Sequence, residues 1–194
     1  MNTFLKKQAR VFGLIVFITG SGMVLDLFKP NSSDAATSRE IDVSVDVAMD
    51  RFHEEVHGSE NLVKKSKGVL VFPKVYKAGF GIGGEYGEGA LRIDGKTVDY
   101  YNTAAASIGF QLGVQVKTVI LIFMNENTLK DFRNSDGWEA GVDGSVALIT
   151  VGMGDSLDTT NIKDPILGFI LSQKGLMYNL TLEGSKFTKM DKTE

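Results

Sequence analysis

The chain has 194 residues, 43% of them hydrophobic, and a formal net charge of -3 at pH 7. This composition supplies a buried core and excludes a wholly disordered chain, while the negative charge argues against a general nucleic-acid binder. The absence of cysteine excludes disulfides, thiolate metal sites and a cysteine nucleophile. The 22 glycines and three prolines favour a strand-rich domain with many tight turns.

Residues 1–36 have the pattern of a targeting segment. Three basic residues among the first ten precede residues 11–25, which carry no charge. A transmembrane helix needs about 20 apolar residues, and this run is shorter and contains Gly20 and Gly22. The pattern therefore predicts a signal peptide, with an uncleaved N-terminal anchor as the alternative. It leaves residues 37–194 as the folded domain.

Residues 37–57 are predicted to form a helix that begins with a capping box at Thr37 and Glu40. Its apolar residues recur at steps of three and four, namely Ile41, Val45, Ala48, Phe52 and Val56. The opposite side is acidic, whereas a helix lying on a bilayer would prefer lysine and arginine there. We therefore expect a surface helix packed on the domain.

The end of this helix contains an H-E-x-x-H pattern, from His53 to His57. On a helix, this pattern places two imidazoles on one face for zinc, with Glu54 as the base. These are the only two histidines, so a third ligand would have to be a distant carboxylate, and Phe52 and Val56 mark the buried side. We expect no catalysis, no cofactor and no metal centre. A zinc-dependent hydrolase, or adventitious metal binding by the two histidines, remains as the alternative.

A second short helix, predicted over residues 60–67, opens a basic stretch. Five lysines lie within fourteen residues: Lys64, Lys65, Lys67, Lys74 and Lys77. They form either a solubilising rim or a shared patch, in which each lysine would contribute about 1 kcal/mol at an anionic membrane.

Residues 66–93 form a glycine-rich strand region in which residues 76–83 alternate strictly. A strand face without side chains must be approached by other backbone, by a helix or by a ligand, so we expect a larger residue at Gly81 to crowd its neighbours. Gly79, Gly81 and Gly84 fit the G-x-G-x-x-G spacing of dinucleotide sites. No helix opens after Gly84, so the pattern does not predict a nucleotide site.

Further strands and one helix are predicted along the rest of the chain. Asp94-Gly95 predicts a hairpin turn, followed by strands over residues 96–102 and 107–117. The continuously apolar residues 119–124 predict a central strand buried on both faces, and residues 125–132 predict a short helix.

The C-terminal third is expected to hold a strand over residues 138–151 and a closing hairpin over residues 166–171 and 176–182. The loop between them contains calcium-type oxygen ligands without an EF-hand pattern, so we interpret it as polar turn chemistry. These ligands are Asp155, Asp158, Asn161 and Asp164. The tail from residue 186 onward is expected to fray.

Together, these elements predict an α+β fold. Its core is a glycine-rich, strongly twisted antiparallel sheet that can close toward a barrel. Two N-terminal helices and one short inserted helix complete the domain.

Several blocks of the chain resemble the SYLF domain family. They are residues 67–73 (KGVLVFP), residues 77–84 (KAGFGIGG), residues 108–113 (IGFQLG) and the region 132–141 with Trp138. The resemblance extends from about Val47 to Leu182, nearly all of the expected domain.

This resemblance implies a non-enzymatic lipid-binding module. Eukaryotic members associate with phosphoinositide membranes, and the yeast actin-patch members also bind actin filaments. By resemblance, the membrane-binding residues are the five lysines at 64, 65, 67, 74 and 77, with the apolar stripe of the first helix. The acidic first helix and the export signal argue against actin and phosphoinositides, and leave another anionic phospholipid as the expected ligand. We expect a periplasmic, peripherally membrane-associated protein, with a structural or protein-interaction module of the cell envelope as an alternative.

Overall fold

The computed structural model describes residues 36–149, 163–172, 175–176 and 182–192. Residues Ala36–Glu194 form one compact unit, separate from Met1–Ala35, and the predicted targeting segment lies outside the described residues. The elements are α1 (Ser38–Glu55), α2 (Ser59–Lys65), β1 (Gly68–Ile93), β2 (Lys96–Phe123), α3 (Glu126–Asn134), β3 (Trp138–Glu139), β4 (Ala147–Leu148), β5 (Ile166–Ser172), β6 (Gly175–Leu176) and β7 (Lys186–Met190).

The three predicted helices are confirmed, and local hydrogen bonds explain where they begin. At the start of α1, the Thr37 hydroxyl accepts from the Glu40 backbone N–H at 3.3 Å, and the Glu40 carboxylate accepts from the Thr37 N–H at 2.8 Å. This is the predicted capping box, which satisfies two backbone donors that the helix leaves unpaired. At the start of α3, the Asn125 side chain accepts from the N–H groups of Asn127 and Thr128.

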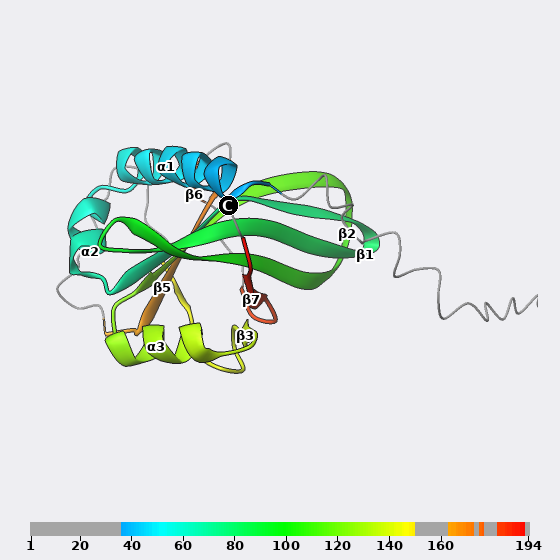
Figure 1. Cartoon of the computed structure of the whole chain (residues 1–194). Coiled ribbons are helices and arrows are strands. Elements are labelled where there is room, and N and C mark those ends of the chain that lie inside the picture. The colour runs from blue at the N-terminus through cyan, green and yellow to red at the C-terminus, as the bar shows by residue number, and fades with distance from the viewer. Residues whose placement is uncertain (1–35, 150–162, 173–174, 177–181, 193–194) are drawn as a thin grey trace, which may run out of the picture. The chain divides into compact units, whose positions relative to one another are not determined.

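The long hairpin of β1 and β2 makes up most of the sheet (Figure 1). Its turn has positive φ angles at Asp94 (51°) and Gly95 (74°), as the predicted two-residue turn requires. Residues 96–102, 107–117 and 119–124, predicted as separate segments, run together as the single strand β2 up to Phe123. β2 also pairs with β7 and with β5. All three of its partners, β1, β5 and β7, run antiparallel to it.

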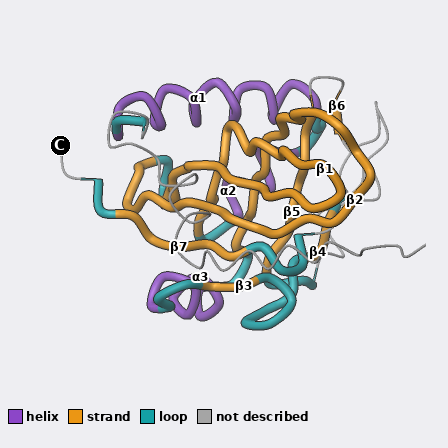
Figure 2. The backbone as a smooth tube through the Cα atoms, turned by 90° about the vertical axis from the view of Figure 1, so that its right-hand side faces the viewer, coloured by secondary structure: helices purple, strands orange, loops and turns teal. Residues whose placement is uncertain are grey.

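The hairpin is strongly curled, so that β1 bends back against itself (Figure 2). A Cβ at Gly89 would collide with the carbonyl oxygen of Val71, and one at Gly87 would lie 2.7 Å from that of Lys74. The ladder between β1 and β2 contains three register shifts, of the kind that bend and twist a strand. The predicted twisted, glycine-rich antiparallel sheet is confirmed, with one parallel pair, β4 with β5.

Hydrophobic residues are buried on both faces of the sheet. Along β2, Val119, Leu121 and Phe123 face one core cluster, with Leu129 and Phe132 of α3, while Ile120 and Ile122 face another. The second cluster contains the apolar stripe of α1, which covers that face: Ile41, Val45, Ala48, Phe52 and Val56. The central strand predicted over residues 119–124 is therefore confirmed as buried on both faces.

Two expectations for the C-terminal third are wrong. The expected strand over residues 138–151 is interrupted after Glu139, because Gly141 takes a φ of 87° and the Asp143 carboxylate accepts from the Glu139 N–H at 2.7 Å. The expected frayed tail instead forms β7, which pairs with β2 and β3. Phe187 holds it in place, because its side chain is buried, with its ring centroid 5.9 Å from that of Trp138.

Candidate functional site

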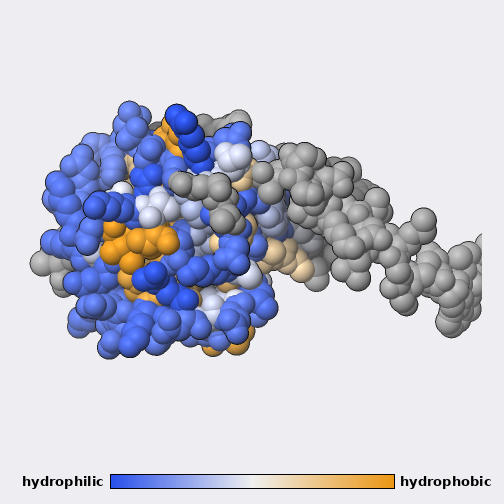
Figure 3. All heavy atoms as spheres, viewed as in Figure 1, coloured by the Kyte–Doolittle hydropathy of each residue, from blue (hydrophilic) through white to orange (hydrophobic). Residues whose placement is uncertain are grey.

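A groove of about 720 Å³ opens between α2 and α3, which lie at the same end of the folded unit (Figure 1). It is lined by the segment Lys64–Lys67, by Ile93 and Asp94 beside the hairpin turn, by one side of α3, and by Lys189 of β7. Figure 3 shows apolar surface on this side of the unit, surrounded by hydrophilic surface. The volume falls within the range of about 300–1,000 Å³ typical of ligand sites.

Cations dominate the lining of this groove. Six basic residues contribute to it, against two acidic residues, Asp94 and Glu126. The basic residues are Lys64, Lys65, Lys67, Lys130, Arg133 and Lys189. We call these six side chains the groove cations. They lie on three different stretches of the chain, which the fold brings together around one hollow.

Three groove cations have no acidic partner among the described residues. Lys65, Lys67 and Lys130 belong to none of the ion pairs found there, and all three are exposed. Lys64 lies 3.8 Å from Glu60, one turn earlier in α2, but both side chains are largely exposed to solvent. Exposed pairs of this kind contribute about 0–1 kcal/mol, so Lys64 keeps most of its capacity to attract an anion.

The remaining two groove cations are held from beneath by a buried carboxylate. Asp99 of β2 has a side chain only 7% exposed, and it accepts from Arg133 Nε at 2.8 Å and pairs with Lys189 Nζ at 2.5 Å. Nearby, burial and the negative charge of Asp99 raise the pKa of Tyr101 to about 12. Tyr101 is therefore neutral at pH 7 and adds no negative charge to this end of the molecule.

Helix geometry explains part of this basic cluster. Lys64 and Lys65 lie in the last turn of α2, and Arg133 lies in the last turn of α3. Cations in a last turn complement the partial negative charge of a helix C-terminus. Lys67, Lys130 and Lys189 lie outside those turns, so helix stability does not account for them.

The five lysines predicted from the sequence do not all meet in the groove. Lys64, Lys65 and Lys67 line it, whereas Lys74 is exposed on β1 and is not among the lining residues. Lys77 lies 3.2 Å from Glu85, which also pairs with Lys117 at 2.5 Å. Burial alone would raise the pKa of Glu85, but hydrogen bonding and the charges of Lys117 and Lys77 outweigh it and lower that pKa.

Sequence reasoning missed Lys130, Arg133 and Lys189. Lys130 lies within the helix predicted over residues 125–132 and Arg133 lies one residue beyond it, so their spacing of three would have been a signal only if the helix had been extended. Lys189 gave no such signal, because it lies in the segment that was expected to fray.

The H-E-x-x-H pattern does not form the helical geometry that a zinc site requires. Helix α1 ends at Glu55, and Val56 is extended, so His57 lies beyond the helix. His53 is hydrogen-bonded through Nδ1 to the Ser59 hydroxyl at 2.9 Å. In the described part of the chain, no group of three or more histidine, aspartate and glutamate side chains is arranged to hold a metal ion. Of the loop ligands, Asp155, Asp158 and Asn161 lie outside the described residues, and Asp164 is exposed.

The apolar stripe of α1 is not available at the surface. Ile41, Val45 and Phe52 are at most 3% exposed, because they pack into the sheet. The apolar residues that α1 does expose are Val43 and Val47, on its other side. Within the described residues, no helix is both long and apolar enough to span a bilayer.

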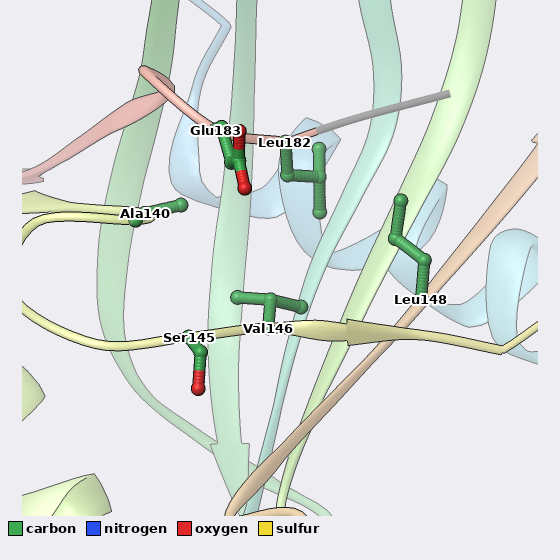
Figure 4. Close-up of a pocket in the computed structure, with 7 residues that line it drawn as sticks. Ala140, Ser145, Val146, Leu148, Leu182 and Glu183 are labelled. Atoms are coloured by element: carbon green, nitrogen blue, oxygen red, sulfur yellow. The ribbon is translucent and has the colours of Figure 1, made fainter. Parts of the chain in front are cut away.

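A second, smaller hollow of about 220 Å³ lies between the segment 140–148 and Leu182–Glu183 (Figure 4). Its lining is mainly small or apolar, with Val146, Leu148 and Leu182 close to one another. Its one charged lining residue is Glu183, which is acidic. This hollow therefore lacks the positive charge that an anionic ligand needs.

Comparison with known proteins agrees with the two later blocks recognised in the sequence, at residues 108–113 and 132–141. The family model Ysc84, described as "Las17-binding protein actin regulator", matches residues 104–194, which include most of β2 and all of α3 and β7. A search of curated proteins gives no match. The matched family is that of the SYLF domains, a family of lipid-binding and actin-related domains. Residues 104–194 of the chain thus match the SYLF family, as the sequence blocks within this stretch predicted.

Proposed function

We propose that this domain binds anionic phospholipid at a membrane surface through the groove cations, without catalysing a reaction. We further propose that it does so after export, as a peripheral protein of the periplasm. The observation that carries the proposal is the gathering of six cations against two carboxylates around one groove, on a chain whose formal net charge is negative. Because exposed charges are screened beyond about a Debye length, a local cluster of cations can attract an anionic surface in spite of the negative total.

The strength of this attraction can be bounded. Each lysine or arginine near an anionic membrane contributes about 1 kcal/mol, and the effect falls off within a Debye length. Lys65, Lys67 and Lys130 offer their charge without an acidic partner among the described residues, while Asp94 and Glu126 oppose it. We therefore expect a modest, reversible interaction that depends on salt.

Vesicle co-sedimentation with paired variants tests the proposal. The double variant Lys65→Glu/Lys67→Glu should lose most binding to vesicles that contain phosphatidylglycerol. The control, Arg39→Glu/Lys74→Glu, changes the net charge by the same amount at two exposed residues outside the groove. It should retain binding close to that of the unmodified chain, because the attraction is local rather than a property of net charge.

Stability must be measured in parallel. All four substituted side chains are exposed, and exposed charges contribute little to the free energy of unfolding. Equal loss in both double variants would mean that charge spread over the surface binds the membrane, and would contradict a role for the groove. Undiminished binding by Lys65→Glu/Lys67→Glu would contradict the proposal outright.

A further inference from the structure

We propose that the groove is selective for a phosphate monoester over a phosphodiester, because its opposed walls present several cations to one small, highly charged group. This inference deepens the proposed function and rests on it. The monoester can belong to a lipid headgroup, as in phosphatidic acid, or to a soluble phosphate ester. The two sources share the terminal phosphate that the groove would hold.

The groove has two basic walls of different character. One wall consists of the exposed Lys64, Lys65 and Lys67, in and just after α2. The other consists of Lys130 and Arg133 of α3 with Lys189 of β7. A flat basic patch attracts any anionic surface, but cations on two facing walls favour a ligand that carries more than one charge on one group.

Asp99 gives the second wall a fixed geometry. Its buried carboxylate bonds Arg133 and Lys189 through different oxygens, at 2.8 Å and 2.5 Å, which ties α3 and β7 to β2. The bond to Arg133 uses Nε, so the two terminal nitrogens of the guanidinium are not used in it. Those terminal nitrogens are the donors with which arginine binds phosphate oxygens. We therefore assign Asp99 as a positioning residue.

The chemistry of the ligand follows from this count of cations. A phosphate monoester carries a charge of about −1.5 to −2 at neutral pH and three acceptor oxygens. A phosphodiester has a single charge and two free oxygens, so it can satisfy fewer donors. The carboxylates of Asp94 and Glu126 also line the groove and would repel an anion. A phosphate monoester that contacts the cations of both walls at once gains the most attraction to offset this repulsion.

The test compares vesicles of phosphatidic acid and of phosphatidylglycerol in phosphatidylcholine, matched for measured surface potential. Phosphatidic acid should bind about tenfold more tightly, since its monoester offers more charge and one more acceptor oxygen to the same cations. Lys130→Gln should reduce this preference, whereas Lys74→Gln, an exposed control outside the groove, should leave it unchanged.

Asp99→Asn tests the positioning role. Compared with the unmodified chain, the variant should show a smaller ratio of affinity for phosphatidic acid to affinity for phosphatidylglycerol, because Arg133 and Lys189 lose the carboxylate that fixes them. A merely structural role would weaken both interactions together. If Asp99→Asn does not fold, Lys130→Gln still tests monoester selectivity, since that side chain is exposed and has no acidic partner in the described chain.

An experiment with a soluble phosphate monoester distinguishes monoester selectivity from the proposed membrane function. Glycerol 3-phosphate should shift the NMR resonances of Lys65, Arg133 and Lys189 in the absence of any membrane. Equal binding of the two vesicle types, with no such shifts, would overturn monoester selectivity and leave general anionic-lipid binding intact. Shifts without vesicle binding would support the monoester site and contradict the membrane function.

Discussion

At the scale of single residues, the close approach of backbone at the glycines of β1 makes a clear prediction. Gly89→Ala should lower the free energy of unfolding by about 1–3 kcal/mol, as overpacked sites do. The added Cβ would meet the Val71 carbonyl oxygen and lie 2.7 Å from Phe72 Cδ1. Urea denaturation measures the change.

Gly84→Ala is the matched control for Gly89→Ala on the same strand. The nearest atom to its added Cβ is the Ala105 carbonyl oxygen at 3.7 Å, an ordinary contact. Gly84→Ala should therefore cost little stability. If the two variants were equally stable, β1 would not fold against itself as described. Gly81, the residue expected from the sequence to crowd, pairs with Gly109 in the ladder, and its surroundings lie outside the described side chains.

Single residues also mark what the sequence could predict of the site. Lys64, Lys65 and Lys67 were found because they are adjacent in the chain. Lys130, Arg133 and Lys189 join them only because α3 and β7 fold to the same end of the unit. Nothing local indicates that Asp99 lies beneath two of these cations. Contacts between residues far apart in the chain cannot be predicted from the spacing of neighbouring residues.

At the scale of secondary-structure elements, Glu85 links distant parts of the curled hairpin. Its carboxylate pairs with Lys77 of β1 and Lys117 of β2, and these charges lower its pKa despite burial. A carboxylate with a lowered folded-state pKa stabilises the fold above its unfolded pKa, and this contribution is lost as the pH falls through the folded-state value. The sign of the effect is therefore loss of stability in acid.

Glu85→Gln should remove this contribution. The variant should be less stable than the unmodified chain at pH 7, because it leaves Lys117, whose side chain is 9% exposed, without its partner. The difference between the two proteins should shrink as the pH is lowered below about 4.5, the ordinary pKa of glutamate. Urea unfolding at a series of pH values measures it, and a constant difference at every pH would refute the assignment.

Helix α1 yields a second prediction at this scale. Its apolar stripe is buried in the sheet, so membrane binding should not release it. Because the chain has no cysteine, single cysteines can report on exposure. Val45→Cys, at a fully buried position, should stay protected from a thiol reagent with and without vesicles, while Val47→Cys, at a 63% exposed position, should react in both conditions. Labelling at residue 45 only with vesicles would show that α1 leaves the sheet to bind the bilayer.

The elements also show where sequence reasoning works. Helices α1 and α3 and the hairpin turn have local signals: the capping box at Thr37, the Asn125 cap and Asp94-Gly95. The strong twist was predicted, but the approach of β1 to itself was not, because glycine spacing indicates close approach of backbone without showing which segment approaches. The strand β7 was missed for a similar reason, since its stability comes from pairing with β2 and β3 and from burial of Phe187.

At the scale of the whole molecule, a negative chain that binds an anionic surface must do so through a local field. Binding should weaken steeply with salt, because the Debye length falls from about 10 Å at 0.1 M to about 3 Å at 1 M ionic strength. Vesicle co-sedimentation over this range measures the effect. Binding that persists unchanged at 1 M salt would point to buried apolar contact with the bilayer rather than to the groove cations.

The most direct test of the groove as the membrane-binding site is mass-spectrometric footprinting of lysines, with and without anionic vesicles. The account predicts that vesicles protect Lys64, Lys65, Lys67, Lys130 and Lys189 from acylation. Lys74, which is exposed outside the groove, should react equally in both conditions. Protection of Lys74 with continued labelling of Lys65 and Lys130 would place the membrane on another surface and contradict the account.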